Sequence, residues 1–224
     1  MKRATSVVLV VTLFLVCGTA GIESVSSQEP KIIDLPEPAL KGSVTLEETL
    51  ARRRSVRSFT PEPLTMAELG QLVWAAQGIT LPSRGFRTAP SAGALYPIEL
   101  YIVTSDGLYH YVPQGHKLRL LKEADLRDEL ARAAGRQSSV REGAADFVVT
   151  AVYARTMRKY REHWKKYVHI EVGHVGQNIH LQAVALGLGS VSVGAFDDER
   201  VRSVLSSPAD HEPLYIIPVG HPAT

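Results

Sequence analysis

An uninterrupted apolar run, FVVTAVY, lies within residues 146–153 and limits the architectures open to this chain. A strand that alternates polar and apolar residues can face water on one side, whereas a continuous apolar run is typical of a fully buried strand. The run therefore predicts a strand inside a sheet that helices cover. With 224 residues, the chain is long enough to bury one sizeable core around it.

The remaining patterns predict helices and strands that alternate along the chain without internal repeats. A helix begins near Leu46, and Thr65 with Glu68 forms a capping box for a second helix that Gly78 ends. Further helices are predicted at 123–134, 172–186 and after Asp197, strands at 98–103, 108–112, 118–121, 191–193 and 214–219, a hairpin turn at 106–107 and a loop at 79–97. The expected fold class is α+β, one domain with a mixed central sheet flanked by helices.

The first residues are typical of an export signal. Lys2 and Arg3 precede an apolar stretch at 7–16, and the small residues at 18–20 offer a cleavage site. The stretch is too short to span a membrane. The sequence therefore predicts a signal peptide at 1–20, a linker or arm without apolar periodicity at 21–45, and a folded domain at 46–224.

Cleavage near Ala20 would also remove Cys17, the only cysteine of the chain. A mature chain that begins near Gly21 would then contain no cysteine, which suits an oxidising periplasmic or extracellular compartment. Lipidation of Cys17, which would attach the protein to a membrane, is the alternative. Val16 is larger than the small residue expected before a lipidated cysteine, so cleavage is favoured.

The overall charge and the histidine spacing argue against two classes of ligand. The 25 basic residues are spread along the chain and balanced by 23 acidic ones, which does not favour a nucleic-acid partner. His163, His169, His174 and His180 are spaced 6, 5 and 6 residues apart, so none forms the i, i+4 pair of a helical zinc site. No metal site is predicted.

Three guanidinium groups and a hydroxyl are concentrated in the five-residue segment RRSVR at 53–57. In extended backbone, Arg53, Ser55 and Arg57 project to one face. Arginine presents a planar fork of donors that matches phosphate, and a serine hydroxyl can donate to a remaining oxygen. This face is therefore a candidate cradle for a phosphate dianion, and a solvated basic patch is the alternative.

Two further segments are candidates for contact with a flat ligand. Small residues in PSAGALYP at 90–97 allow the backbone to approach a ring closely, and Ser91 adds a hydroxyl; an ordinary turn is the alternative. The segment GLGSVSVGAFD at 187–197 contains no GxGxxG or GxxxxGK pattern, so it is not a phosphate-binding loop of those types. Gly194 and Ala195 could present backbone N–H groups to a ring edge.

In this order, the motifs at 53–59, 90–97 and 187–197 resemble the nitroreductase superfamily of flavin enzymes. The resemblance is closest to the SagB-type dehydrogenases, which include thiazoline- and oxazoline-oxidising enzymes, and extends over about residues 46–222. It implies a nitroreductase-like fold and a homodimer with FMN at its interface. It also implies a flavoprotein oxidoreductase that transfers hydride through flavin N5, with NAD(P)H as a possible transient donor and a small-molecule substrate that the sequence does not identify.

The same resemblance implies roles for individual residues. The arginine segment would hold the phosphate and ribityl chain, the loop of the other subunit would line the isoalloxazine, Gly194 and Ala195 would lie beside N5, and the long helix would supply secondary contacts. The implied flavin-binding residues are Arg53, Arg54, Ser55, Arg57, Pro90, Ser91, Ala92, Gly93, Gln177, Asn178, Gly194 and Ala195. For the pair on the long helix, an ordinary polar helix face is the alternative.

Lys159 and Tyr160 resemble the Lys-Tyr pair with which azoline dehydrogenases remove a proton. A lysine in that role needs its pKa lowered by burial or by neighbouring cations, which Arg158, Arg161 and Lys165 could supply. A solvated basic turn is the alternative. His221 is the only basic residue near the C-terminus that could reach the flavin phosphate. A non-catalytic flavin-binding or small-ligand-binding protein on the same fold therefore remains the second hypothesis.

Overall fold

The computed structural model describes residues 31–223. The predicted signal peptide, Cys17 and the first part of the predicted arm, residues 21–30, lie outside the described residues. Within the described range, no helix is both long and apolar enough to cross a membrane.

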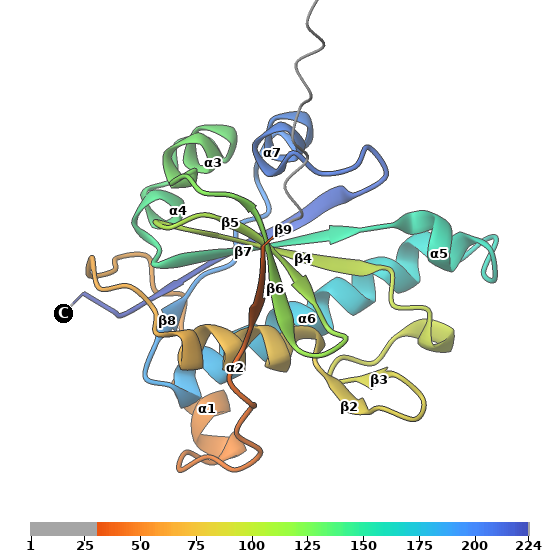
Figure 1. Ribbon diagram of the computed structural model, residues 1–224, viewed down its shortest axis with the longest axis horizontal. Coiled ribbons are helices and arrows are strands. Elements are labelled where there is room, and N and C mark those ends of the chain that lie inside the picture. Colours follow the sequence, from red (N-terminus) through yellow and green to blue (C-terminus); the bar gives the residue numbers. More distant parts are fainter. Residues whose placement is uncertain (1–30, 224) are drawn as a thin grey trace, which may run out of the picture.

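Among these residues, seven strands form one sheet in the order β1-β6-β5-β4-β7-β9-β8 (Figure 1). The interior strand β7 (Ala145–Ala151), between β4 and β9, has all seven residues buried, which confirms the prediction from the apolar run. Every ladder between these strands is antiparallel, and Ser55–Ser190 is an isolated parallel bridge, so the prediction of a mixed sheet was wrong for the ladders. The other strands are β1 (Ile32–Asp34), β4 (Ile98–Thr104), β5 (Leu108–Val112), β6 (Lys117–Lys122), β8 (Gly189–Ser190) and β9 (Glu212–Gly220).

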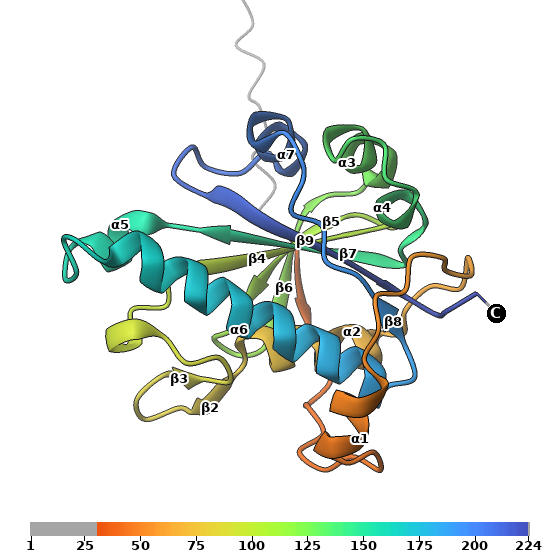
Figure 2. The same cartoon turned by 180° about the vertical axis from the view of Figure 1, so that it is seen from behind.

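Helices cover both faces of the sheet. One core lies between the sheet and the helices α2 (Met66–Gln77) and α6 (Trp164–Ala185); a second core lies under α3 (Arg127–Ala133) and α7 (Asp198–Leu205) on the opposite face. Figures 1 and 2 show α1, α2 and α6 on one side of the strands and α3, α4 and α7 on the other. The remaining helices are α1 (Leu46–Arg52), α4 (Ser138–Glu142) and α5 (Tyr153–Met157).

The two helices nearest the N-terminal end of the domain both begin with a capping box. Thr65 and Glu68 start α2, as predicted, and Thr45 and Glu48 start α1 in the same way. In each box the threonine hydroxyl accepts from the glutamate N–H, while the glutamate carboxylate accepts from the threonine N–H. Because α1 is fixed at this end, it delivers Arg53 at a defined position.

Several predicted boundaries differ from the structure. The helix expected at 123–134 begins only at Arg127, and the Asp125 carboxylate just before it accepts a hydrogen bond from the Arg127 N–H at 3.1 Å. The helix expected at 172–186 begins earlier, at Trp164. The sequence did not indicate this start, because the first two turns of α6 carry mostly polar and aromatic residues that show no apolar stripe. The helix α4 was not predicted.

The segment expected to be a loop at 79–97 contains three short elements. A two-stranded sheet pairs β2 (Ile79–Leu81) with β3 (Phe86–Arg87), and a 3-10 turn, η1, spans Ala92–Ala94. Similarly, β1 lies in the predicted linker or arm and pairs with β6. These strands have two or three residues each, which is too short for a period-2 pattern to be recognised in the sequence.

Candidate functional site

The arginine segment is held in place by pairing with β8. The Val56 N–H donates to the Ser190 carbonyl at 3.0 Å, and Ser55 forms the parallel bridge to Ser190. A Cβ built on Gly189 would lie 2.7 Å from the Val56 Cβ, so only glycine allows this close approach. The pairing therefore brings two separately predicted motifs, the phosphate cradle and the segment 187–197, side by side.

Within this segment, the arginines have different environments. Arg57 is exposed and Arg53 is half-buried, and neither forms an ion pair within residues 31–223. The Arg54 guanidinium instead donates to the carbonyls of Ala51 and Arg53, at 3.0 and 2.8 Å, near the carboxyl end of α1. Arg53, Ser55 and Arg57 thus have side-chain donors available for a ligand, whereas the Arg54 side chain is turned back to its own helix.

Residues 221–223, near the C-terminus, pair with residues 58–60, which directly follow the arginine segment. Thr60 N–H donates to the His221 carbonyl at 2.9 Å, Ala223 N–H donates to the Ser58 carbonyl at 3.0 Å, and Phe59 bridges Pro222. His221, the residue considered for the flavin phosphate, therefore lies beside the arginine segment. Its Nε2 is buried and has no hydrogen-bond partner within the described residues.

His180 has a polar role in the core, and the sequence did not indicate its two serine partners. This buried residue of α6 has Nδ1 2.7 Å from the Ser190 hydroxyl and Nε2 2.7 Å from the Ser192 hydroxyl. Burial lowers its pKa to about 4, and the charge of Arg53 acts in the same direction. His180 is therefore neutral at physiological pH and joins α6 to the segment after β8. Its place next to Ile179 in the buried stripe was the only signal in the sequence.

Gly194 and Ala195 lie just beyond this clamp and are both exposed. A Cβ built on Gly194 meets no atom within 4 Å, and the N–H groups of Gly194 and Ala195 form no hydrogen bond within residues 31–223. The Ala195 carbonyl accepts from the Gln137 amide at 3.4 Å. The backbone here is open on one side and has free donors, as contact with a ring edge would require.

The loop 90–97 is held by its own side chains in a strained conformation. Ser91 Oγ accepts from the Tyr96 N–H at 2.9 Å, and the Tyr96 hydroxyl accepts from the Arg87 N–H at 3.1 Å. Gly93 has φ +64°, but Ala94 and Tyr96 also have positive φ, at 53° and 46°. Non-glycine residues in this region cost about 1–3 kcal/mol each and are concentrated at functional sites. Pro90 and Gly93 are exposed, and Ala92 is half-buried.

Lys159 and Tyr160 meet this loop at Gly93. A Cβ built on Gly93 would lie 2.9 Å from Lys159 Nζ and 3.0 Å from the Tyr160 hydroxyl. The structure thus brings together the predicted catalytic pair and the predicted flavin-lining loop, which are 66 residues apart in the chain. Lys159 is exposed, so the burial expected of a catalytic lysine is absent. The Tyr160 ring packs edge-on against Tyr167, with 5.0 Å between centroids.

The two polar residues of α6 considered as secondary flavin contacts have different environments. The Asn178 amide donates to the Ala75 carbonyl of α2 at 2.9 Å and joins the two helices. Gln177 is exposed. The structure provides a packing role for Asn178, which agrees with the alternative of an ordinary polar helix position.

Glu171 is a second buried titratable group on α6 that sequence reasoning missed. It is 2% exposed, and its Oε1 has no hydrogen-bond partner within residues 31–223. Burial raises its pKa to about 7, while a hydrogen bond with Ser91 and the charge of Arg87 oppose the rise. The Arg87 guanidinium is held by the Gln77 amide oxygen at 2.8 Å. A carboxyl that titrates near neutrality therefore lies directly behind the loop 90–97.

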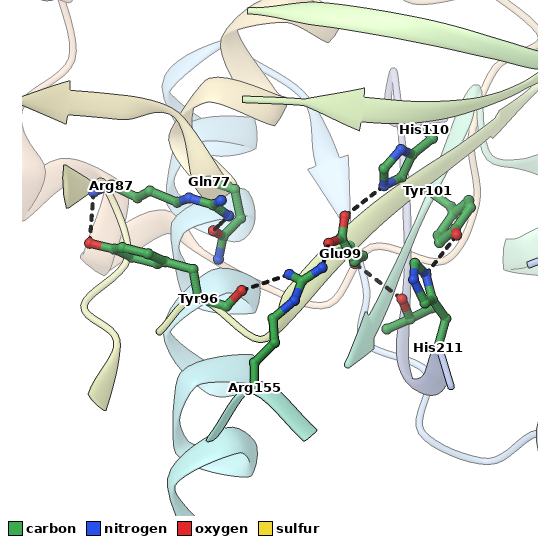
Figure 3. Close-up of polar contacts among 9 residues, drawn as sticks. Gln77, Arg87, Tyr96, Glu99, Tyr101, His110, Arg155 and His211 are labelled. Carbon is green, nitrogen blue, oxygen red and sulfur yellow. Dashed lines mark hydrogen bonds and ion pairs between the residues drawn. The ribbon is translucent and has the colours of Figure 1, made fainter. Parts of the chain in front are cut away.

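A polar network links this loop to the opposite side of the sheet (Figure 3). Arg155 donates to the Tyr96 carbonyl at 2.9 Å and forms an ion pair with Glu99, whose other oxygen lies 2.7 Å from His110 Nε2. Burial alone would raise the pKa of Glu99, but the hydrogen bond from His110 and the charge of Arg155 lower it to about 2. Arg155 is therefore fixed beside the loop by a carboxylate that stays ionised.

The two groups of candidate residues lie toward opposite ends of α6. His180 and Arg53 lie near its C-terminal end, while Gly93 meets Lys159, just before its N-terminal end. Trp164 and His180 are 16 residues apart, which corresponds to about 24 Å along the axis. Figures 1 and 2 agree on this arrangement, with η1 and α5 at one end of α6 and α1 and β8 at the other.

Comparisons of this chain with protein families, with related sequences and with solved structures all indicate the same family. Residues 50–221 match the protein family described as the nitroreductase family. A protein of Methanocaldococcus jannaschii, itself assigned as a nitroreductase, is 43% identical over 79% of this chain and 91% of its own length. The crystal structure of another protein with that assignment, from Ralstonia eutropha JMP134, has a TM-score of 0.79 and 32% identity, covering 86% of this chain and 90% of that one.

Two more distant relatives have more specific names. FMN reductase (NADPH) of Bacillus subtilis is 27% identical over 79% of this chain and 65% of its own length. The trifolitoxin-processing protein of Rhizobium leguminosarum bv. trifolii is 31% identical over 54% of this chain, and the match covers 35% of that protein. The matched half of this chain therefore corresponds to about a third of the trifolitoxin-processing protein.

Proposed function

This chain belongs to the nitroreductase family and has its fold, and we propose on that premise that it is an FMN-dependent oxidoreductase. One observation carries the proposal: the pairing of the arginine segment with β8 brings the candidate phosphate donors next to the open backbone at Gly194. A related flavin enzyme, the FMN reductase of B. subtilis, supports FMN as the cofactor and NAD(P)H as the electron donor.

The residues of this chain fit such a cofactor. Arg53, Ser55 and Arg57 would hold the phosphate, because their donors are not used within the described part of the chain. The free N–H groups of Gly194 and Ala195 would contact the ring edge. When bound, FMN supplies the redox chemistry by accepting hydride at N5 and passing the electrons on. The protein binds the ring and holds the substrate against it.

A homodimer is part of the proposal. In one chain, the phosphate donors and the loop 90–93 lie toward opposite ends of α6, with Trp164 and His180 about 24 Å apart along the helix. A flavin held at Arg53 would meet the loop more readily if a second copy supplied it. Exposed apolar side chains on α1 and α6, namely Leu46, Leu50 and Ile170, offer surface for this interface.

The SagB-type specificity is also a proposal. It is supported by the contact of Lys159 and Tyr160 with Gly93 and by the similarity to the trifolitoxin-processing protein. In this reading Lys159 accepts a proton from the substrate while Tyr160 donates a hydrogen bond to it. The exposure of Lys159 favours the second candidate function, a flavin-binding protein without this proton transfer.

Purification and anaerobic reduction would test the function. We expect a yellow protein with an absorbance maximum near 450 nm (roughly, as for any flavin) that NADPH or another donor bleaches. A colourless protein that does not take up added FMN would reject flavin binding. A yellow protein that no donor in a broad panel bleaches would support the non-catalytic alternative. Light scattering of the yellow protein at micromolar concentration tests the dimer.

Export is a separate proposal that rests on the sequence alone. Residues 1–20 have the pattern of a cleaved signal, so a mature protein beginning near Gly21 is expected outside the cytoplasm. N-terminal sequencing of protein from the native host tests this directly. An intact Met1 on cytosolic protein would reject export, and a lipid on Cys17 would indicate membrane anchoring instead.

A further inference from the structure

A groove of 420 Å³ lies between the loop 90–97 and α5. It is lined by Leu95, Arg155, Arg158 and Lys159, and no carboxylate among residues 31–223 lines it. Lys159 Nζ also lies at Gly93, as described above, so the groove is adjacent to the loop that we propose to face the flavin. The loop contributes an apolar side chain, and α5 with the turn after it contributes three cations.

The three cations of the groove are not equally available. Arg155 is paired with Glu99 and bonded to the Tyr96 carbonyl, so its position is fixed and its charge is partly compensated. Arg158 and Lys159 form no ion pair within residues 31–223, and the Arg158 side chain donates only to the Ala154 carbonyl, at 3.3 Å. Two uncompensated cations beside a fixed one make the groove suited to an anion.

The surroundings of the groove also suit a flat, apolar body. The Tyr160 ring lies next to Lys159, with Nζ 5.5 Å from the ring centroid, and Tyr167 packs edge-on against that ring. Leu95 provides an apolar contact in the groove itself, while the space over Gly93 is already filled by Lys159 and Tyr160. A ligand would thus place its charge at Arg158 and its ring against Leu95, next to Lys159.

We propose that this groove binds small aromatic anions, such as aromatic carboxylates, as the substrate class of the site. The inference rests on the proposed function, because the ring of such a ligand would be the part presented to the flavin. In this assignment, Arg158 is a specificity-determining residue that selects an anion, whereas Lys159 and Tyr160 contact the reacting part of the substrate.

The test compares two probes that differ mainly in charge, 4-nitrobenzoate and 4-nitrobenzyl alcohol. Nitroaromatic groups quench tryptophan fluorescence, and Trp164 packs against Tyr153 at the start of α5, near the groove. We expect saturable quenching by the carboxylate at least 10-fold tighter than by the alcohol. Equilibrium dialysis of the unchanged protein provides a second measurement of both affinities.

Two arginine variants distinguish a direct contact with the ligand from a general electrostatic attraction by the basic surface. Arg158→Gln should weaken 4-nitrobenzoate about 5- to 10-fold and leave the alcohol unchanged, as expected for loss of one charge-assisted contact at an open site. Arg161→Gln removes the same charge from the same connection between α5 and α6, but from a side chain that does not line the groove. Its effect should stay below about 2-fold, because exposed charges are screened.

Three results would overturn the inference: equal affinity for the two probes, quenching that does not saturate, or equal effects of Arg158→Gln and Arg161→Gln. None of these measurements depends on turnover. A protein that binds 4-nitrobenzoate but is not bleached by any donor would reject the proposed redox function and leave the groove assignment standing. A protein that reduces neutral acceptors but does not prefer the anion would support the proposed redox function and reject the groove assignment.

Discussion

The buried titratable groups toward the two ends of α6 differ in how fully their polar atoms are hydrogen-bonded. Near the C-terminal end, both ring nitrogens of His180 are bonded to serine hydroxyls at 2.7 Å. Toward the N-terminal end, Glu171 Oε1 has no partner within residues 31–223, and the nearby loop contains strained residues. The first arrangement is closed and holds a segment rigidly. The second contains a buried carboxylate oxygen without a hydrogen-bond partner, as is common where a protein must adapt to a ligand.

This difference gives the two ends opposite dependences on pH. The pKa of His180 falls from 6.5 to about 4 on folding, so the unfolded chain binds the proton more readily and stability rises between pH 4 and 6.5. The pKa of Glu171 rises from 4.5 to about 7, so the folded chain keeps its proton longer and stability falls between pH 4.5 and 7. In the wild type the two effects oppose each other.

The largest expected effect comes from Glu171→Gln, which removes the titration at one end. Relative to this variant, the wild type should lose about 3 kcal/mol of unfolding free energy between pH 4.5 and 7.5, because one pKa unit corresponds to about 1.4 kcal/mol. Urea unfolding at several pH values measures the difference. Glu162→Gln, at an exposed position, is the control and should show no such trend. A constant offset between wild type and Glu171→Gln would contradict the assignment.

At the other end, His180→Ala should cost about 2–3 kcal/mol at pH 7. The substitution leaves two serine hydroxyls without their partner and opens a cavity. His174→Ala, at an exposed position of the same helix, should change stability by less than about 0.5 kcal/mol. Thermal unfolding of both variants would test whether the hydrogen bonds of His180 to Ser190 and Ser192 stabilise the protein. Similar melting temperatures for the two variants would argue against this.

The function of the closed end can be tested through FMN. Arg57→Ala should weaken FMN binding by about 1.5–3 kcal/mol, typical of a lost hydrogen bond to a charged group. Arg54→Ala should have a smaller effect, because the Arg54 guanidinium is bonded to the carbonyls of α1. Fluorescence titration of the apoprotein with FMN measures both affinities. If Arg57→Ala binds FMN as tightly as the wild type, the phosphate cradle is assigned incorrectly.

The smallest expected effect is that of Gly189→Ala, at about 1–2 kcal/mol. The new Cβ would lie 2.7 Å from the Val56 Cβ, and Val56 is tied to Ser190 by a backbone hydrogen bond, so neither side moves freely. Gly194→Ala meets open space and should leave the melting temperature unchanged. Chemical unfolding of the two variants side by side is the measurement, and equal stabilities would mean that the strand pairing is looser than described.

Local chemistry made part of the fold predictable from the sequence. Thr65 with Glu68 and the run FVVTAVY each specify an element through neighbouring residues, and both predictions are confirmed. The strand β1 was not recognised because three residues at the edge of a sheet carry little pattern of their own. Its hydrogen bonds depend on β6, which lies more than 80 residues away.

For the candidate site, the sequence indicated the exposed groups but not the buried ones. The segments around Arg53 and Gly93 contain unusual combinations of residues, and such combinations are visible without a structure. Glu171 and His180 look like ordinary polar positions of a helix, since their burial follows from how α6 packs on the sheet. The contact between Lys159 and Gly93 likewise depends on tertiary structure, because 66 residues separate them.

The pairing of residues 58–60 with residues 221–223 has a kinetic consequence. About 160 residues separate the two partners, and contacts with such large sequence separation form late because the connecting chain must first be ordered. We therefore expect the arginine segment to reach its final position only after the sheet between these partners has assembled. A chain emerging from the ribosome, or one threaded unfolded across a membrane, would complete the proposed phosphate site near the end of folding, and FMN in the medium should speed the last phase of refolding more than the first.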